Sequence, residues 1–290
     1  MIPILKNIEI APNIFEMTLE HPRLAKKLRP GHFVIVMASE DAERIPLTAA
    51  DFDAEAGTVT LVIMAVGTST KKIVKLQEGQ QLFALMGPLG HPSEIENYGT
   101  VIMTAGGVGT APIYPIAKEL HRQGNRVITI QGAKTKELLF WQDKMSAVSN
   151  EYIITTDDGS AGRKALVTEP LREILEQRGS AGSGGEIGCV YMIGPAVMMK
   201  FCAQTAAPFG VKTVASLNSI MIDGTGMCGG CRVQIGHETK FTCVDGPEFD
   251  AEKVDWDVLL ARQKMYCHEE QCSYRLYLDS TAEPPLPQTG

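Results

Sequence analysis

The sequence predicts three structural parts in chain order: a small β-barrel, an open α/β domain built on a parallel sheet, and a small cysteine-rich domain. Three observations predict this order. Short alternating apolar runs fill the first third of the chain, a strand–glycine turn–helix–strand unit opens the middle, and three closely spaced cysteines follow. We place the parts at residues 1–98, 99–213 and 214–260, with a C-terminal extension over residues 261–290.

The composition indicates a soluble globular protein. The chain has 290 residues, of which 44% are hydrophobic, enough for a sizeable core. The formal net charge of -7 argues against nucleic acid as a partner, because phosphate binding needs a basic surface. No segment reaches the roughly 20 apolar residues of a membrane span, and the N-terminus lacks the features of a signal peptide. We therefore expect a cytoplasmic protein without a membrane partner.

The barrel is predicted from alternating apolar runs separated by Gly, Pro and acidic turns. The clearest runs are His32–Ser39 and Thr58–Val66. Several short strands at this spacing are typical of a small barrel.

The α/β domain begins with an apolar strand at Val101–Ala105, a glycine turn, a helix and a second strand at Arg126–Ala133. This order is a βαβ unit. Two further continuous apolar runs, in "EYIITTDDGS" and "GCVYMIGP", predict buried parallel strands. Between them, residues 179–188 predict a surface loop.

The glycine turn at Thr104–Pro112 predicts a nucleotide site, because glycines let a pyrophosphate approach the backbone at a helix N-terminus. The spacing is not that of the ordinary dinucleotide fingerprint, and a tight turn without a ligand is the alternative. The segments Thr155–Ser160 and Met192–Lys200 should share the same sheet edge. Met198 and Met199 could be core residues, and for Met198 we expect this.

A flavin site is suggested within the barrel by "ERIPLTAAD" at Glu43–Asp51, where an Arg precedes a strand that carries a Thr. Val66–Lys71 and Leu85–Pro92 add glycine-rich turns with hydroxyl residues nearby. The alternative for each motif is a surface Arg or an ordinary β-turn. The order of a barrel followed by a nucleotide fold carries more weight than any one motif.

The late cysteines have the spacing C-x2-C-x11-C at Cys228, Cys231 and Cys243. Their number and clustering favour thiolate ligands in a reducing compartment over disulfides. Zinc, inert buried thiols and a redox C-x-x-C are the alternatives to a [2Fe–2S] cluster. The plant-type cluster pattern C-x4-C-x2-C…C places Asp223 at the first ligand position. Asp223 is interpreted as a carboxylate ligand, and a turn-forming Asp-Gly pair is the alternative.

Taken in order, these motifs resemble the ferredoxin–NADP reductase superfamily, in the branch with a C-terminal [2Fe–2S] domain. The resemblance rests on R-I-P-L-T, M-G-P-L-G-H-P, G-G-V-G-T-A-P, D-D-G-S, I-G-P-x-x-M-M and D-x4-C-x2-C-x11-C-V-D-G-P-x-F. The branch includes dihydroorotate dehydrogenase electron-transfer subunits, whose first ligand is Cys, and small subunits of electron-bifurcating NADH-dependent ferredoxin:NADP oxidoreductases, whose first ligand is Asp. Asp223 favours the bifurcating type.

The resemblance implies FAD, a [2Fe–2S] cluster, and NAD(H) or NADP(H) as substrate, with no catalytic acid or base. It also implies a larger partner subunit that carries a second flavin and [4Fe–4S] clusters, in a heterodimer or larger heteromer, with ferredoxin reached through that partner. NADH would pass a hydride to FAD, and single electrons would continue to the cluster. A dihydroorotate-type subunit, and a non-catalytic scaffold that binds nucleotide and zinc, are the alternative functions.

The residues that the resemblance assigns fall into three groups. The flavin residues are Arg44, Pro46, Leu47, Thr48, Ile63, Met64, Ala65, Ser69, Thr70, Gly87 and Pro88. The nicotinamide nucleotide residues are Gly106, Gly107, Gly109, Thr110, Pro112, Asp157, Asp158 and Gly194. The cluster ligands are Asp223, Cys228, Cys231 and Cys243.

Two features depart from the family pattern. Ile45 separates Arg44 from Pro46, which loosens the role of Arg44. The extension carries Cys267 and Cys272, for which free thiols are expected, and a weak metal site with His268 or a partner contact are alternatives. Cys189 and Cys202 are expected as buried core thiols.

Overall fold

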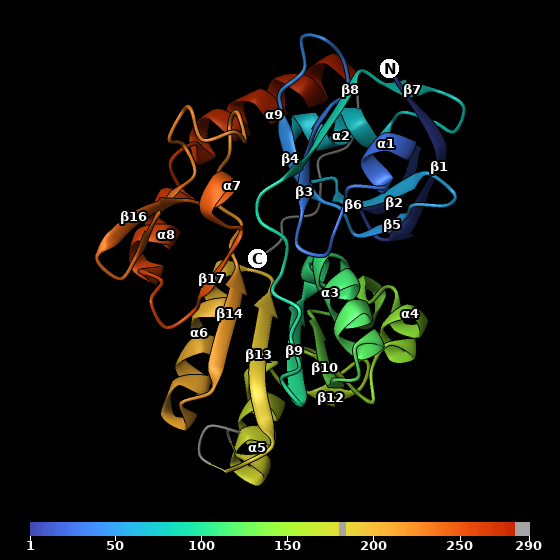
Figure 1. Cartoon of the computed structure of the whole chain (residues 1–290). Coiled ribbons are helices and arrows are strands. Elements are labelled where there is room, and N and C mark those ends of the chain that lie inside the picture. The colour runs from blue at the N-terminus through green and yellow to red at the C-terminus, as the bar shows by residue number, and fades with distance from the viewer. Residues whose placement is uncertain (180–183, 282–290) are drawn as a thin grey trace.

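The computed structural model describes residues 1–179 and 184–281 (Figure 1). The barrel and the α/β domain are stacked, and the cysteine-rich region lies beside both of them. The middle of the predicted loop at 179–188 and the tail at 282–290 lie outside the described residues.

The barrel consists of two antiparallel sheets around one core. The larger has the order β5-β6-β2-β1-β7, and the smaller β4-β3-β8. Its elements are β1 (Ile2–Ala11), β2 (Ile14–Glu20), α1 (Pro22–Ala25), β3 (Phe33–Met37), β4 (Ile45–Thr48), β5 (Asp51–Asp53), β6 (Thr58–Met64), α2 (Thr68–Val74), β7 (Gln81–Leu82) and β8 (Ala84–Leu89). The two runs predicted as strands correspond to β3 and β6, so those predictions are confirmed.

The α/β domain contains a seven-stranded sheet with the order β12-β11-β10-β9-β13-β14-β17, parallel except for β17. Its elements are β9 (Thr100–Gly106), α3 (Thr110–Arg122), β10 (Arg126–Ala133), α4 (Gln142–Ala147), β11 (Glu151–Thr156), β12 (Arg163–Lys164), α5 (Thr168–Arg178), β13 (Ile187–Ile193), α6 (Ala196–Ala206) and β14 (Lys212–Ser216). The predicted βαβ unit is therefore β9–α3–β10.

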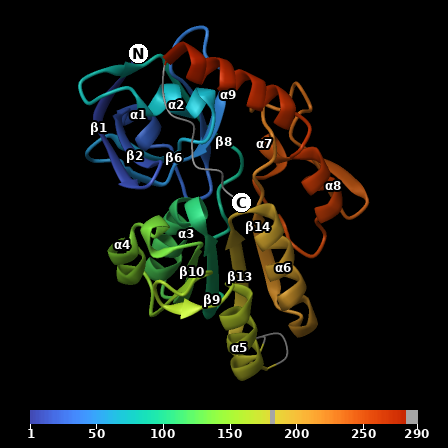
Figure 2. The ribbon, with the colours of Figure 1, turned by 180° about the vertical axis from the view of Figure 1, so that it is seen from behind.

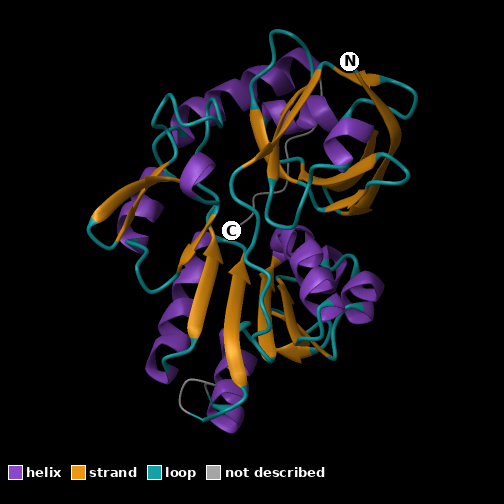
Figure 3. Ribbon diagram, viewed as in Figure 1, coloured by secondary structure: helices purple, strands orange, loops and turns teal. Residues whose placement is uncertain are grey.

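Helices cover both faces of this sheet (Figure 3). The side chains along β9 alternate between these two faces. Val101 and Met103 pack with α3 on one face, whereas Ile102 packs with α5 and α6 on the other. Cys189 and Cys202 are fully buried in these two cores, as predicted. Burial raises the pKa of each thiol to about 12, which keeps both unreactive at neutral pH.

The cysteine-rich region returns to the sheet of the α/β domain. It contains β15 (Arg232–Ile235), β16 (Glu238–Phe241), α7 (Thr242–Asp245), β17 (Glu248–Asp250) and α8 (Trp256–Arg262). Strand β17 pairs with β14, and the predicted boundary at residues 213–214 falls inside β14. The α/β domain and the cysteine-rich region thus share one sheet.

The C-terminal extension forms helix α9 (Cys267–Thr281), which runs from the cysteine-rich region to the barrel (Figure 2). It lies against α2, where the hydroxyl groups of Thr68 and Ser273 are 3.2 Å apart. The Lys75 ammonium also lies 4.8 Å from the centre of the buried Tyr277 ring. Among the described residues, no helix is long and apolar enough to cross a membrane.

Candidate functional site

The three predicted cysteine ligands lie in or beside one glycine-rich loop between β14 and β15. Cys228 and Cys231 close this loop, and Cys243 lies in α7 directly after the β15–β16 hairpin. The hairpin turns the chain back, so that the Sγ atoms of Cys231 and Cys243 lie 3.2 Å apart. These two side chains are buried with Phe33 and Ile35 of barrel strand β3, whereas Cys228 is exposed.

Asp223 lies early in the same loop, and its carboxylate accepts hydrogen bonds from three backbone N–H groups. The donors are Thr225 and Met227, each at 3.0 Å, and Cys228 at 2.9 Å. The Thr225 N–H contributes most to holding the pKa of Asp223 below its ordinary value, and the Cys228 side chain and N–H contribute further. A charged carboxylate thus lies beside the Cys228 thiol.

The four predicted ligands therefore form two pairs, Asp223 with Cys228 and Cys231 with Cys243. Four-ligand binuclear clusters place two protein ligands on each iron, so this pairing fits a [2Fe–2S] cluster. A structural zinc ion instead takes four ligands around one point. Within residues 1–179 and 184–281, no three His, Cys, Asp or Glu side chains gather in that way. The donor set fits the binuclear cluster.

The glycines of the loop have two separate uses. Gly224 has a φ of 74°, and a Cβ there would lie 2.8 Å from Ile35, so the loop can approach the barrel only with glycine at that position. Gly230 donates its N–H to Cys228 Sγ at 3.3 Å, and Cys243 donates its N–H to Cys231 Sγ at 3.4 Å. Such N–H···S bonds orient thiolate ligands and tune the metal that they hold.

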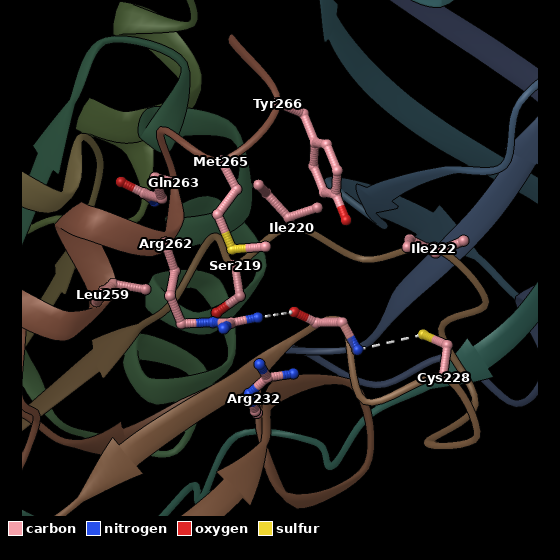
Figure 4. A pocket seen from close by; sticks show the side chains of 11 residues that line it. Ser219, Ile220, Ile222, Cys228, Arg232, Leu259, Arg262, Gln263, Met265 and Tyr266 are labelled. Atoms are coloured by element: carbon pink, nitrogen blue, oxygen red, sulfur yellow. Dashed lines mark hydrogen bonds between the residues drawn. The ribbon is translucent and has the colours of Figure 1, made fainter. Parts of the chain in front are cut away.

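A cavity of about 130 Å³ lies beside Cys228, between the loop and the start of the C-terminal extension (Figure 4). Arg232 and Arg262 both line it. Arg232 donates to the Gly229 carbonyl at 3.1 Å, and Arg262 donates to the Gly230 carbonyl at 2.9 Å. The sequence reasoning missed both arginines, because neither occurs in a motif with the cysteines.

The barrel residues predicted for the flavin lie on and beside β4. Pro46, Leu47 and Thr48 are half-buried on this strand, which pairs with β3. Arg44 precedes the strand, and one guanidinium nitrogen lies 3.5 Å from Met86 Sδ. The Nε of Arg44 is buried and has no hydrogen-bond partner among the described residues. A buried guanidinium nitrogen without a partner fits the binding of an anionic or carbonyl-bearing group.

The predicted flavin residues at the end of β6 face different directions. Ile63 and Ala65 are fully buried in the barrel core, so only their main-chain groups can reach a ligand. Met64 is 37% exposed and is the one of the three whose side chain faces outward. Strand alternation explains this difference, because it places neighbouring side chains on opposite faces.

Ser69 and Thr70 lie in the first turn of α2 and have different environments. The Thr70 hydroxyl accepts hydrogen bonds from the N–H groups of Val66 and Gly67, each at 3.1 Å, and thereby caps the helix. Ser69 donates to Glu43 and lines a cavity of about 200 Å³. The other residues that line this cavity are Ala38, Asp41, Ala42, Glu43, Thr68, Lys72, Ile73 and Ser273. The contribution of Ser273 was not predicted, because it comes from α9.

Gly87 and Pro88 lie in strand β8, which pairs with β3 beside β4. A Cβ on Gly87 would lie 2.8 Å from the buried Val34 side chain. Packing within the smaller sheet therefore requires this glycine whether or not a flavin lies nearby.

The predicted nucleotide turn joins β9 to α3, as expected. Gly106 ends β9, Gly107 and Gly109 form a single 3-10 turn, and Thr110 opens α3 with Pro112 in its first turn. A Cβ on Gly106 would collide with Met198, and one on Gly109 with the Ile193 carbonyl. Gly107 differs from both: its φ is 54°, and a Cβ there would meet nothing within 4 Å. Of these three glycines, Gly107 is thus the one with open space beside it.

The other predicted nucleotide residues share the same sheet edge, because β9, β11 and β13 are parallel. Gly194 follows β13, and a Cβ there would lie 3.1 Å from the Gly106 Cα. Asp157 and Asp158 follow β11, and the Asp158 carboxylate accepts bonds from the Ser160 N–H at 2.9 Å and hydroxyl at 2.6 Å. The side-chain bond from Ser160 is the main cause of a lowered pKa of Asp158.

The two methionines after Gly194 both contact the core, as the sequence allowed, but they are buried to different extents. Met199 is fully buried in the core, whereas Met198 is only partly buried and lies against the glycine turns. Met198 therefore lies at the rim of the predicted nucleotide site.

Comparisons with known proteins match two domain families. Residues 218–255 match the iron–sulfur cluster binding domain of dihydroorotate dehydrogenase B. Residues 103–204 match the oxidoreductase NAD-binding domain. The first match contains all four predicted cluster ligands, and the second contains the predicted nucleotide residues.

Whole-chain relatives extend these matches. The dihydroorotate dehydrogenase B electron-transfer subunit homologue of Thermotoga maritima is 44% identical over 97% of this chain and 96% of its own length. The electron-transfer subunit of Bacillus mycoides is 30% identical, covering 85% of this chain and 94% of its own. The chain belongs to the family of dihydroorotate dehydrogenase B electron-transfer subunits and their homologues.

Among solved structures, a chain of the NADH-dependent reduced ferredoxin–NADP oxidoreductase is 44% identical, with a TM-score of 0.89. The match covers 96% of this chain and 98% of that one, and that enzyme is described as carrying out flavin-based electron bifurcation. The fold is thus that of the ferredoxin–NADP reductases with a C-terminal iron–sulfur domain, as predicted. As a family member, the chain is an oxidoreductase subunit.

Proposed function

We propose that this chain is the small flavin and iron–sulfur subunit of an electron-bifurcating, NADH-dependent ferredoxin:NADP oxidoreductase. It exchanges a hydride between NAD(H) and FAD and relays single electrons through a [2Fe–2S] cluster to or from a larger subunit. The pairing of Asp223 with Cys228 and of Cys231 with Cys243 is the observation that carries this proposal. The resemblance assigns Asp at the first ligand position to the bifurcating type.

FAD, when bound, accepts a hydride and releases electrons singly, and the [2Fe–2S] cluster carries one electron at a time. The protein's part is to hold these groups in place and to tune their potentials. Asp223, Cys228, Cys231 and Cys243 would hold the cluster, and the cysteine pair is shielded from water by β3 of the barrel. The cluster site is therefore packed directly against the domain proposed to hold the flavin.

For the flavin, the barrel offers two neighbouring groups of contacts. Thr48 and the open nitrogen of Arg44 would hydrogen-bond the ring system and its phosphates. In the cavity at α2, Ser69 and Lys72 suit phosphate, and Asp41 and Glu43 suit ribose hydroxyls. No side chain is required as an acid or base, because hydride transfer to a flavin needs none.

For the nicotinamide nucleotide, we propose the sheet edge at Gly107, with Asp157, Asp158 and Gly194 at its rim. The open space at Gly107 supports this placement, since an anionic group can approach the backbone there without meeting a side chain. The carboxyl ends of parallel strands are where open α/β sheets bind their ligands.

The larger partner and the compartment complete the proposal. The described residues outside the loop contribute no further cysteine cluster, so [4Fe–4S] clusters would belong to the partner. Exposed cysteines, including Cys267 and Cys272, favour a reducing compartment such as the cytoplasm.

Anaerobic purification with analysis of iron, sulfide and flavin tests the proposal. We expect about two irons, two sulfides and one FAD per chain, which is the content of one [2Fe–2S] cluster and one flavin site. Co-purification from the native source should recover a subunit with a flavin and further iron–sulfur clusters. Zinc without iron, or a chain without flavin, would contradict the proposal and leave a nucleotide-binding scaffold.

A second candidate is the electron-transfer subunit of a dihydroorotate dehydrogenase, which the names of the curated relatives favour. Under this alternative, the co-purified partner oxidises dihydroorotate and carries no [4Fe–4S] cluster. Asp223 in place of Cys argues against it.

A further inference from the structure

We propose that Arg262 and Arg232 are positioning residues that hold the Cys228–Cys231 loop and raise the reduction potential of the [2Fe–2S] cluster. The inference rests on the proposed function, because it requires the cluster to be held by this loop. It concerns two side chains outside the ligand set.

Arg262 reaches the loop from another part of the chain. It lies at the end of α8, and its guanidinium is half-buried in the cavity beside Cys228 (Figure 4). It donates to the Gly230 carbonyl at 2.9 Å, and the N–H of that same residue donates to Cys228 Sγ at 3.3 Å. Gly230 is thus fixed at both its N–H and its carbonyl, which fixes the direction of the N–H···S bond.

Arg232 acts on the adjacent peptide unit. It donates to the Gly229 carbonyl at 3.1 Å, and that carbonyl belongs to the same peptide group as the Gly230 N–H. A donor on the carbonyl polarises the peptide and strengthens the bond that its N–H makes. The Cys228 sulfur therefore accepts a bond that a guanidinium reinforces, although the exposed position of Arg232 weakens its effect relative to that of Arg262.

In the part of the chain that the structure describes, neither guanidinium forms an ion pair with a carboxylate. Reduction adds one electron and no proton, so the site becomes more negative by one charge. Nearby positive charge and hydrogen bonds to sulfur both stabilise the reduced state and thereby raise the potential.

A redox titration of the purified chain with its cluster, followed by electron paramagnetic resonance, tests the inference. Arg262→Gln should lower the midpoint potential, and Arg262→Lys should restore most of it because the charge is kept. Removing one nearby positive charge should lower the equilibrium constant for reduction severalfold, by an amount set by the effective dielectric constant. The exposed Arg172→Gln on α5 is the control for lost charge and should leave the potential unchanged.

Arg232→Gln is the second variant, for use if Arg262→Gln loses its iron. The Arg232 side chain is exposed, so its loss should not affect folding. It should lower the potential by less than Arg262→Gln. Unchanged potentials in variants that retain two irons would overturn the inference. A wild-type chain without a cluster would instead overturn the proposed function, so the two failures can be told apart.

Discussion

The Asp223 carboxylate accepts the backbone N–H of Cys228 at 2.9 Å, five positions along the same loop. This bond places the one carboxylate of the predicted ligand set beside the exposed cysteine. It also shows that Asp223 shapes its own turn, since Thr225 and Met227 donate to the same group. The same carboxylate can therefore serve the turn through its N–H bonds and the predicted cluster through its charge.

Substitution at Asp223 separates these two roles. Asp223→Asn keeps a side-chain oxygen that can accept the N–H bonds, but it removes the anionic ligand. We expect this variant to fold and bind FAD while losing iron, whereas Asp223→Cys should retain iron because thiolate is the softer ligand. Iron and flavin assays on the purified variants give the answer. Full iron content in Asp223→Asn would assign the residue to the turn alone.

The turn between β9 and α3 allows packing and ligand binding to be distinguished. Gly107 has a φ of 54° and open space beyond it, so Gly107→Asn should keep the fold and lower the affinity for nicotinamide nucleotide. Gly109→Ala should instead lower the thermal unfolding temperature, because its Cβ would collide with the Ile193 carbonyl. Binding calorimetry and thermal unfolding of both variants provide the comparison. Unchanged affinity in Gly107→Asn would place the nucleotide elsewhere.

Helix α9 is expected to stabilise the barrel through Tyr277. Its ring is buried against α2 and lies under the Lys75 ammonium, so Tyr277→Ala should cost about 1–3 kcal/mol. Leu276→Ala is a matched control on the same helix, since Leu276 is 70% exposed and should change stability little. Thermal unfolding of the two variants measures both changes in stability. Equal effects of the two variants would show that α9 is not docked on α2.

Glu248 predicts a pH dependence of stability. It accepts the Ser93 hydroxyl at 2.5 Å, and burial raises its pKa from 4.5 to about 7. Below pH 4.5, Glu248 is protonated in both the folded and the unfolded chain. Between pH 4.5 and about 7 it is protonated only in the folded chain. Its contribution to stability is therefore lost as pH rises through this range.

Glu248→Gln should flatten that part of the curve of unfolding temperature against pH, because the amide does not titrate. Glu252→Gln, at an exposed position on the same segment, is the control and should leave the shape of the curve unchanged. A Glu248→Gln curve with the wild-type slope would show that another group causes the pH dependence.

The sequence predicted features that depend on local pattern. Alternation gave strands β3 and β6, and continuous apolar runs gave β9, β10, β11 and β13. The spacing of the ligands predicted their grouping in one loop, because three of the four lie within nine residues of each other.

Features that depend on long-range pairing were not predicted. Strand β17 joins β14 across the whole cysteine loop, and Arg262 reaches Gly230 from α8. No periodicity in either segment indicates its partner. The family motif also did not indicate that the side chains of Ile63 and Ala65 point into the barrel core.

The most direct test of the account is an anaerobic titration of the isolated chain with NADH, followed by visible absorption and electron paramagnetic resonance together. The account predicts that NADH bleaches the flavin absorption and that the signal of a reduced [2Fe–2S] cluster then appears. Flavin bleaching without a cluster signal would contradict the proposed relay from flavin to cluster. Absence of both responses from a folded chain would contradict the assignment as an electron-transfer subunit.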